Sequence, residues 1–143
     1  MEPDRYEHLL KAHLNVNPKS WEALQSRGVD ERTPLQLDFE YTAPGEDEVR
    51  VLMRFLRTST DYQFQGGARD EDDGTQRWMV LGSTSPTTWS LDRLNAWVTE
   101  MIAYGRDHGG AEFDGWGARA TAAGPPRGLS IKELLRLRRR GRG

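Results

Sequence analysis

The sequence predicts an α+β fold of the ferredoxin-like type, in which two helices cover one face of a four-stranded antiparallel sheet. Three observations support this prediction: a period of two over residues 35–42, two segments with helical spacing, and the order strand, helix, strand, strand, helix, strand. The chain has 143 residues and no cysteine. One domain with appendages is therefore expected, without disulfides or thiolate metal sites.

The first thirty residues predict two short helices ahead of this domain. Residues 4–14 carry a single apolar stripe at helical spacing. Asn17 and Pro18 are typical of a new helix start, because asparagine caps a helix and proline suits its first turn. An N-terminal helical extension over residues 1–30 is therefore expected.

The first half of the domain is predicted from alternation and from turn residues. Apolar and polar residues alternate over 35–42, which is typical of a half-buried strand. Apolar residues at helical spacing follow over 46–58 and predict a helix. Residues 61–83 predict a hairpin around a charged loop that ends in Gly74.

The second half of the domain consists of a helix and a final strand. Ser90 is a suitable cap for a helix that ends before Gly109 and Gly110. A strand over residues 111–119 follows, with Phe113 and Trp116 as its apolar bulk. The expected domain therefore spans residues 33–121, and residues 122–143 are expected to form a linker and a basic tail.

Charge is distributed unevenly along the chain. The net charge is −2, but the segment from Arg127 to the end carries +6, so the preceding residues carry −8. Such an asymmetry bears on binding partners rather than on the fold. The tail is a candidate RNA-binding segment, although a solvated end without a partner accounts for it equally well. The candidate nucleic-acid-binding residues are Arg136, Arg138, Arg139, Arg140 and Arg142.

The final strand also provides a candidate protein-binding surface. Trp116 lies between Gly115 and Gly117, so no neighbouring side chain obstructs its ring. Strand alternation places Trp116 on the sheet face away from the helices, where carboxylates could capture an arginine-rich segment. In the alternative, the N-terminal helices cover Trp116 as part of the core. The predicted partner-binding residues are Trp116, Asp114, Glu112, Asp38 and Glu40.

No catalytic, cofactor-binding or metal-binding motif occurs in the sequence. The chain lacks a nucleophile elbow, a phosphate-binding loop and the spacing of known metal ligands. It also lacks an apolar run of the length of a signal peptide or a membrane helix. A cytoplasmic protein that is not an enzyme and needs no cofactor is therefore expected.

The run E-F-D-G-W-G at residues 112–117, directly after an amphipathic helix, resembles the bacterial regulator of ribonuclease E activity B family, also called ribonuclease E inhibitor proteins. The order of elements over residues 35–121 is also the order that this family's ferredoxin-like fold requires. The resemblance implies a non-enzymatic protein that binds a ribonuclease and restrains RNA turnover. The familiar enterobacterial members end in an acidic tail, whereas this chain ends in arginines.

Two other functions fit the same sequence. The arginine-rich tail is compatible with a small RNA-binding protein, and an acidic single domain is compatible with an immunity-type protein that neutralises a basic nuclease. The sequence does not identify the partner or the oligomeric state.

Overall fold

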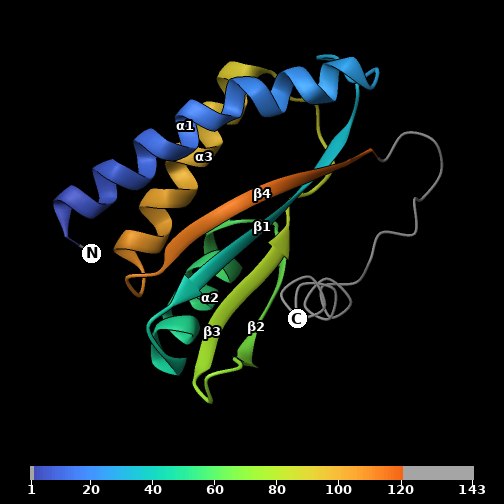
Figure 1. The fold of residues 1–143 in the computed structure, drawn as a ribbon. Helices are drawn as coiled ribbons and strands as arrows, with labels where there is room; N and C mark the ends of the chain where they lie inside the picture. The colour runs from blue at the N-terminus through green and yellow to red at the C-terminus, as the bar shows by residue number, and fades with distance from the viewer. Residues whose placement is uncertain (1, 121–143) are drawn as a thin grey trace.

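The computed structural model describes residues 2–120, which form a four-stranded antiparallel sheet and three helices (Figure 1). The predicted α+β class is therefore confirmed. None of these three helices has the length and apolar character needed to cross a bilayer. Along the chain the elements are α1 (Pro3–Ser26), β1 (Leu35–Ala43), α2 (Glu46–Ser59), β2 (Gln63–Asp70), β3 (Gln76–Ser83), α3 (Leu91–Asp107) and β4 (Glu112–Ala120).

The strands lie in the order β2-β3-β1-β4, so the first and last strands are neighbours. β1 pairs antiparallel with β3 on one side and with β4 on the other. Phe39 of β1 lies opposite Gly82 of β3 and opposite Trp116 of β4. β1 therefore lies between β3 and β4 and sets the register of both.

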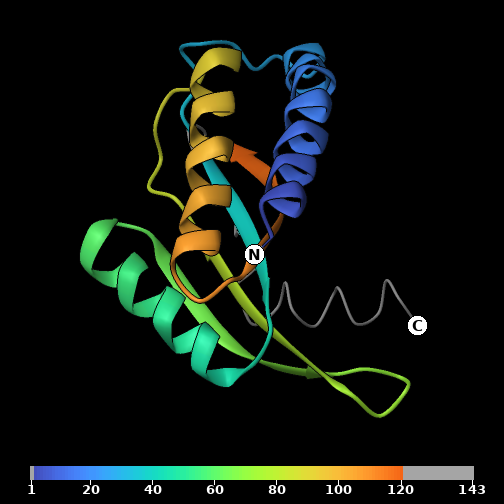
Figure 2. The same cartoon turned by 90° about the vertical axis from the view of Figure 1, so that its left-hand side faces the viewer.

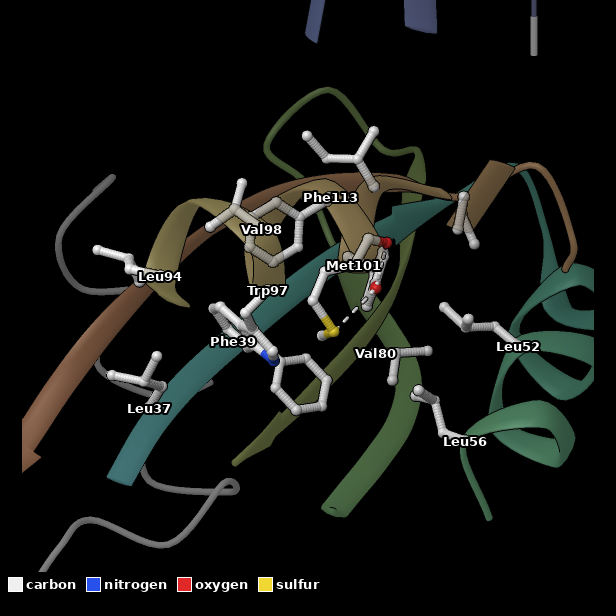
Figure 3. Packing of buried hydrophobic residues seen from close by; sticks show 14 of the residues in the cluster. Leu37, Phe39, Leu52, Leu56, Val80, Leu94, Trp97, Val98, Met101 and Phe113 are labelled. Atoms are coloured by element: carbon white, nitrogen blue, oxygen red, sulfur yellow. Dashed lines mark hydrogen bonds between the residues drawn. The ribbon is translucent and has the colours of Figure 1, made fainter. Parts of the chain in front are cut away.

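All three helices lie on one face of the sheet, which we call the helix face (Figure 2). The apolar side chains of β1 point to this face and are at most 6% exposed, as expected from a period of two. Leu52 and Leu56 of α2 and Trp97 and Met101 of α3 complete the core (Figure 3). We call the opposite side of the sheet the second face.

The N-terminal segment forms one continuous helix, so the prediction of two helices is wrong. Pro18 lies inside α1, where a proline removes one backbone hydrogen bond and typically costs about 3 kcal/mol. Asn17 does not serve as a cap, because its buried side chain donates to Asn95 of α3 (2.9 Å) and accepts from Trp116 of β4 (3.0 Å). These tertiary contacts outweigh the local signal for a helix start.

The hairpin predicted over residues 61–83 is present and is formed by β2 and β3. Pairing extends from Gln63↔Ser83 to Asp70↔Gln76, and the turn closes with a hydrogen bond from the Glu71 amide to the Thr75 carbonyl. Helix α2 packs directly onto β2 at Gly66. A Cβ atom added there would lie 2.6 Å from the Val49 side chain.

Gly82 provides a test of how closely the core packs against the sheet. A Cβ atom at this position would lie 2.3 Å from the Phe39 ring and 2.6 Å from the backbone oxygen of Gln63. We expect Gly82→Ala to lower the free energy of unfolding by about 1 to 3 kcal/mol in urea denaturation, because overpacking displaces neighbours. The matched control is Gly67→Ala in β2, where nothing lies within 4 Å and stability should be unchanged or slightly higher. Equal stability of the two variants would contradict the described packing.

Candidate functional site

Strand β4 contains a bulge that decides which way its side chains point. Tyr41 of β1 lies opposite Phe113, whereas the adjacent Glu40 lies opposite Gly115, so Asp114 is an extra residue. A bulge of this kind shifts the alternation of the strand by one residue. Gly115 has a φ of 145°, a conformation that residues with a side chain rarely adopt. Glycine is therefore needed at this point of the strand.

Trp116 lies on the helix face, so the prediction that it shares the second face with Asp114 is wrong. Residues directly opposite each other in an antiparallel pair share a face, and Trp116 lies opposite the core residue Phe39. Its indole Nε1 donates to the side-chain oxygen of Asn17 in α1 at 3.0 Å. The ring is half-buried beneath the N-terminal helix, which corresponds to the alternative arrangement expected from the sequence.

Two of the predicted carboxylates lie on the second face, each beside an arginine. Asp38 accepts a hydrogen bond from Arg119 at 2.7 Å, and their side chains are about one-fifth and one-quarter exposed. Asp114 lies 3.7 Å from Arg77 and also accepts from the hydroxyl of Thr42. Arg119 and Arg77 therefore already offset much of the negative charge that would attract an arginine-rich partner.

Glu112 is held at the edge of the sheet by a pair of hydrogen bonds from α1. Arg5 donates from Nε to Oε1 at 2.8 Å and from Nη2 to Oε2 at 2.9 Å. These hydrogen bonds lower the pKa of Glu112 below its ordinary value, and burial opposes the shift. The pair links the beginning of α1 to the beginning of β4.

Glu40 is the most buried of the predicted carboxylates. It lies between Leu81 of β3 and Gly115 of β4 and is only 3% exposed, although the sequence predicted an open surface. A shallow hollow of about 200 Å³ is found here, lined in part by Asp38, Glu40 and the two glycines that flank Trp116. The absence of side chains at Gly115 and Gly117 fits such a hollow.

A larger cleft, of about 510 Å³, lies between α3 and the loop that precedes it. Trp89 and Trp97 line it with ring centroids 5.6 Å apart in an edge-to-face arrangement, and both are almost buried. Asp61 and Tyr62, which lead from α2 into β2, form the other wall. The three segments that build the cleft are therefore distant in sequence.

The walls of the cleft are fixed by hydrogen bonds to the sheet. Thr87 and Leu35 exchange two backbone hydrogen bonds of 2.7 and 3.0 Å, which hold the loop against the start of β1. The hydroxyl of Ser85 donates to Asp61 at 2.9 Å and so joins the two walls. These hydrogen bonds hold the loop and the Asp61 segment around the cleft.

The charges of the cleft are separated along α3. Arg93 donates to the Thr88 carbonyl at 2.9 Å and lies 5.2 Å from the centroid of the Trp89 ring. Glu100 lies seven residues after Arg93 on α3, and Asp61, next to Tyr62 in sequence, lines the cleft from another segment. The pKa of Tyr62 is raised, chiefly by burial, with further contributions from Glu100 and Asp61, while a hydrogen bond from Trp97 opposes the shift.

This cleft is not predicted by the sequence. One signal was available: Trp89 and Trp97 are eight residues apart, a spacing that places two residues on similar sides of a helix when both lie on one. Trp89, however, precedes the helix cap Ser90, and Asp61 belongs to another segment. Their proximity depends on tertiary structure alone.

The described residues provide few other candidates for chemistry. Within residues 2–120, no group of three or more His, Asp or Glu side chains could hold a metal ion. His13 contacts the Phe113 carbonyl at 3.0 Å and packs against its ring, and His108 stacks on Phe55. The arginines predicted to bind nucleic acid, at 136–142, lie outside the described residues.

Comparison with known families identifies the class of this protein. The family model described as regulator of ribonuclease activity B matches residues 15–118, from the middle of α1 nearly to the end of β4. The chain therefore belongs to this family, whose members are regulators of ribonuclease activity rather than enzymes. The matched region includes both Asn17 and Trp116. No curated protein matches the chain.

We expect Asn17→Ala to lower the free energy of unfolding by about 1 to 3 kcal/mol, because it leaves the partly buried polar groups of Trp116 and Asn95 without this partner. Urea denaturation measures this change. The matched control is Asn15→Ala on the same helix, where the side chain is exposed and alanine favours the helix. If Asn17→Ala is no less stable than this control, Asn17 does not hold Trp116 in place.

The Arg5–Glu112 pair predicts a pH dependence of stability. Because the pKa of Glu112 is lowered in the folded state, its contribution to stability is present above the unfolded pKa and is lost as the pH falls through the folded pKa. In Arg5→Gln, we expect the pKa of Glu112, measured by NMR titration, to rise towards its ordinary value. An unchanged pKa in this variant would show that the pair does not form in solution.

Proposed function

We propose that this protein binds a ribonuclease and restrains its activity without catalysing a reaction itself. The family match over residues 15–118 carries the proposal, because the family is one of regulators of ribonuclease activity. A regulator of an enzyme needs a surface for that enzyme, so the partner is a protein. Ribonuclease E in the cytoplasm is the first target to test, as the resemblance of the E-F-D-G-W-G run implies.

We assign the fold to the ferredoxin-like type, with α1 added at its N-terminus. The order of elements from β1 to β4 and the strand order β2-β3-β1-β4 support this assignment. A fold alone does not define a function, however, so the proposal rests on the family and on the surfaces of the domain.

The surface predicted from the sequence remains one proposed contact for the ribonuclease. The hollow beside Asp38 and Glu40 supports it, while the arginine partners of Asp38, Asp114 and Glu112 weaken its acidic character. Trp116 would act there by supporting β4 from the helix face rather than by touching the partner.

A second proposed function is RNA binding through the basic tail, which the charge of +6 after residue 126 favours. One experiment separates the two functions: cleavage of an RNA by ribonuclease E is followed with and without the purified chain. We expect the chain to slow cleavage and to cleave no RNA alone. A full-length variant with Arg138, Arg139 and Arg140 changed to glutamine should restrain cleavage equally if the ribonuclease is the target. An unchanged cleavage rate with the wild-type chain contradicts the first function, and loss of restraint only in the variant favours the second.

A further inference from the structure

We propose that the cleft between α3 and the loop preceding it binds an arginine or lysine side chain from a basic segment of the protein partner. The inference rests on the proposed function, in which the partner is a protein. It adds where on the domain that partner binds and by which chemistry. It depends on the size and aromatic lining of the cleft, on two carboxylates at its mouth, and on its fixed walls.

The size and lining of the cleft suit a long side chain with an apolar stem. Its volume of about 510 Å³ lies within the range of roughly 300 to 1,000 Å³ that is typical of ligand sites. Tyr62, Trp89 and Trp97 provide the apolar lining, against which the methylene groups of arginine or lysine can pack. The hydrogen bond from Trp97 Nε1 to the Tyr62 hydroxyl (3.0 Å) fixes two of these rings relative to each other.

The carboxylates of the cleft retain capacity for a cation. Asp61 accepts from the Ser85 hydroxyl through one oxygen, and Glu100 accepts from the Tyr104 hydroxyl through one oxygen. Within residues 2–120, neither forms a salt bridge, in contrast to Asp38, Asp114 and Glu112. An ionised carboxylate accepts several hydrogen bonds, so both groups can still bind a guanidinium or an ammonium group.

The two carboxylates line the same cleft. Asp61 and Glu100 both belong to its lining, as Tyr62 does, and both contribute to raising the pKa of Tyr62, in addition to the larger effect of burial. A cation that enters the cleft is therefore attracted by both carboxylates. Two carboxylates around one cation define its position better than a single exposed ion pair does.

Arg93 gives the cleft a direction. It lies seven residues before Glu100 on α3, which corresponds to about 10 Å along the helix. Its guanidinium is held over Trp89 and disfavours a second cation at that end. A basic residue followed at some distance by an acidic or carbonyl group therefore fits this cleft better than an uninterrupted basic run does.

The test uses the full chain labelled with ¹⁵N and a short capped peptide that contains one arginine followed at some distance by an acidic residue. A matched peptide contains citrulline, which has nearly the shape of arginine without its charge. We expect the arginine peptide to shift the indole signals of Trp89 and Trp97. Changing Asp61→Asn and Glu100→Gln together should weaken binding roughly five- to tenfold, as expected for two partly exposed charge-assisted contacts. Glu22→Gln on the exposed side of α1 is the matched control and should bind as the wild type does.

Several results would overturn the inference. The inference is wrong if the arginine and citrulline peptides bind equally, or if the double variant binds as tightly as the wild type. It is also wrong if the shifts fall around Asp38 instead of the tryptophans. The chain's own arginines at 136–142 offer the same chemistry. If replacing them with glutamine shifts the tryptophan signals in the absence of peptide, the tail occupies the cleft and the assignment to a partner is wrong.

The ribonuclease assay separates this inference from the proposed function. Restraint of cleavage that persists unchanged in the Asp61→Asn, Glu100→Gln variant leaves the proposed function standing and contradicts the role of the cleft. Peptide binding at the cleft without any effect of the wild-type chain on the ribonuclease supports the site and contradicts the proposed function.

Discussion

The conformation of Gly115 is the constraint on which the arrangement of β4 and α1 depends. With its φ of 145°, this residue allows Asp114 to be inserted into the strand opposite the Glu40–Tyr41 step. The insertion places both Phe113 and Trp116 on the helix face, although they are three positions apart in sequence. An uninterrupted strand would turn one of these rings away from the helices.

The N-terminal helix depends on this arrangement. The inward-facing Trp116 donates to Asn17, and Asn17 in turn donates to α3, so one buried amide joins three elements. His13 and Arg5 add contacts to Phe113 and Glu112 of the same strand. The helix is thus bound to the domain along much of its length, and the family match includes its second half.

The sequence predicted the elements better than it predicted the orientation of their side chains. The alternation from Leu35 to Tyr41 and the apolar spacing of α2 and α3 are local signals, and the predicted ranges agree closely with the observed bounds. The orientation of Trp116 depends on one inserted residue, which a simple period of two cannot reveal. Asn17 and Pro18 resemble a helix start locally, and only the contacts with α3 and β4 explain why the helix continues. The cleft combines Asp61, Trp89 and Glu100, whose proximity requires the folded chain.

The surroundings of the Trp116 ring provide the most direct test of this account. Nuclear Overhauser contacts of the indole protons in the full chain identify the side chains packed against the ring, whose heavy atoms lie within about 4.5 Å of it. We predict contacts with the side chain of Asn17 and with other residues of α1. Contacts with the side chains of Asp38 or Leu81 on the second face, and none with α1, would contradict the bulge, the docking of the helix and the preference for the cleft as the partner site.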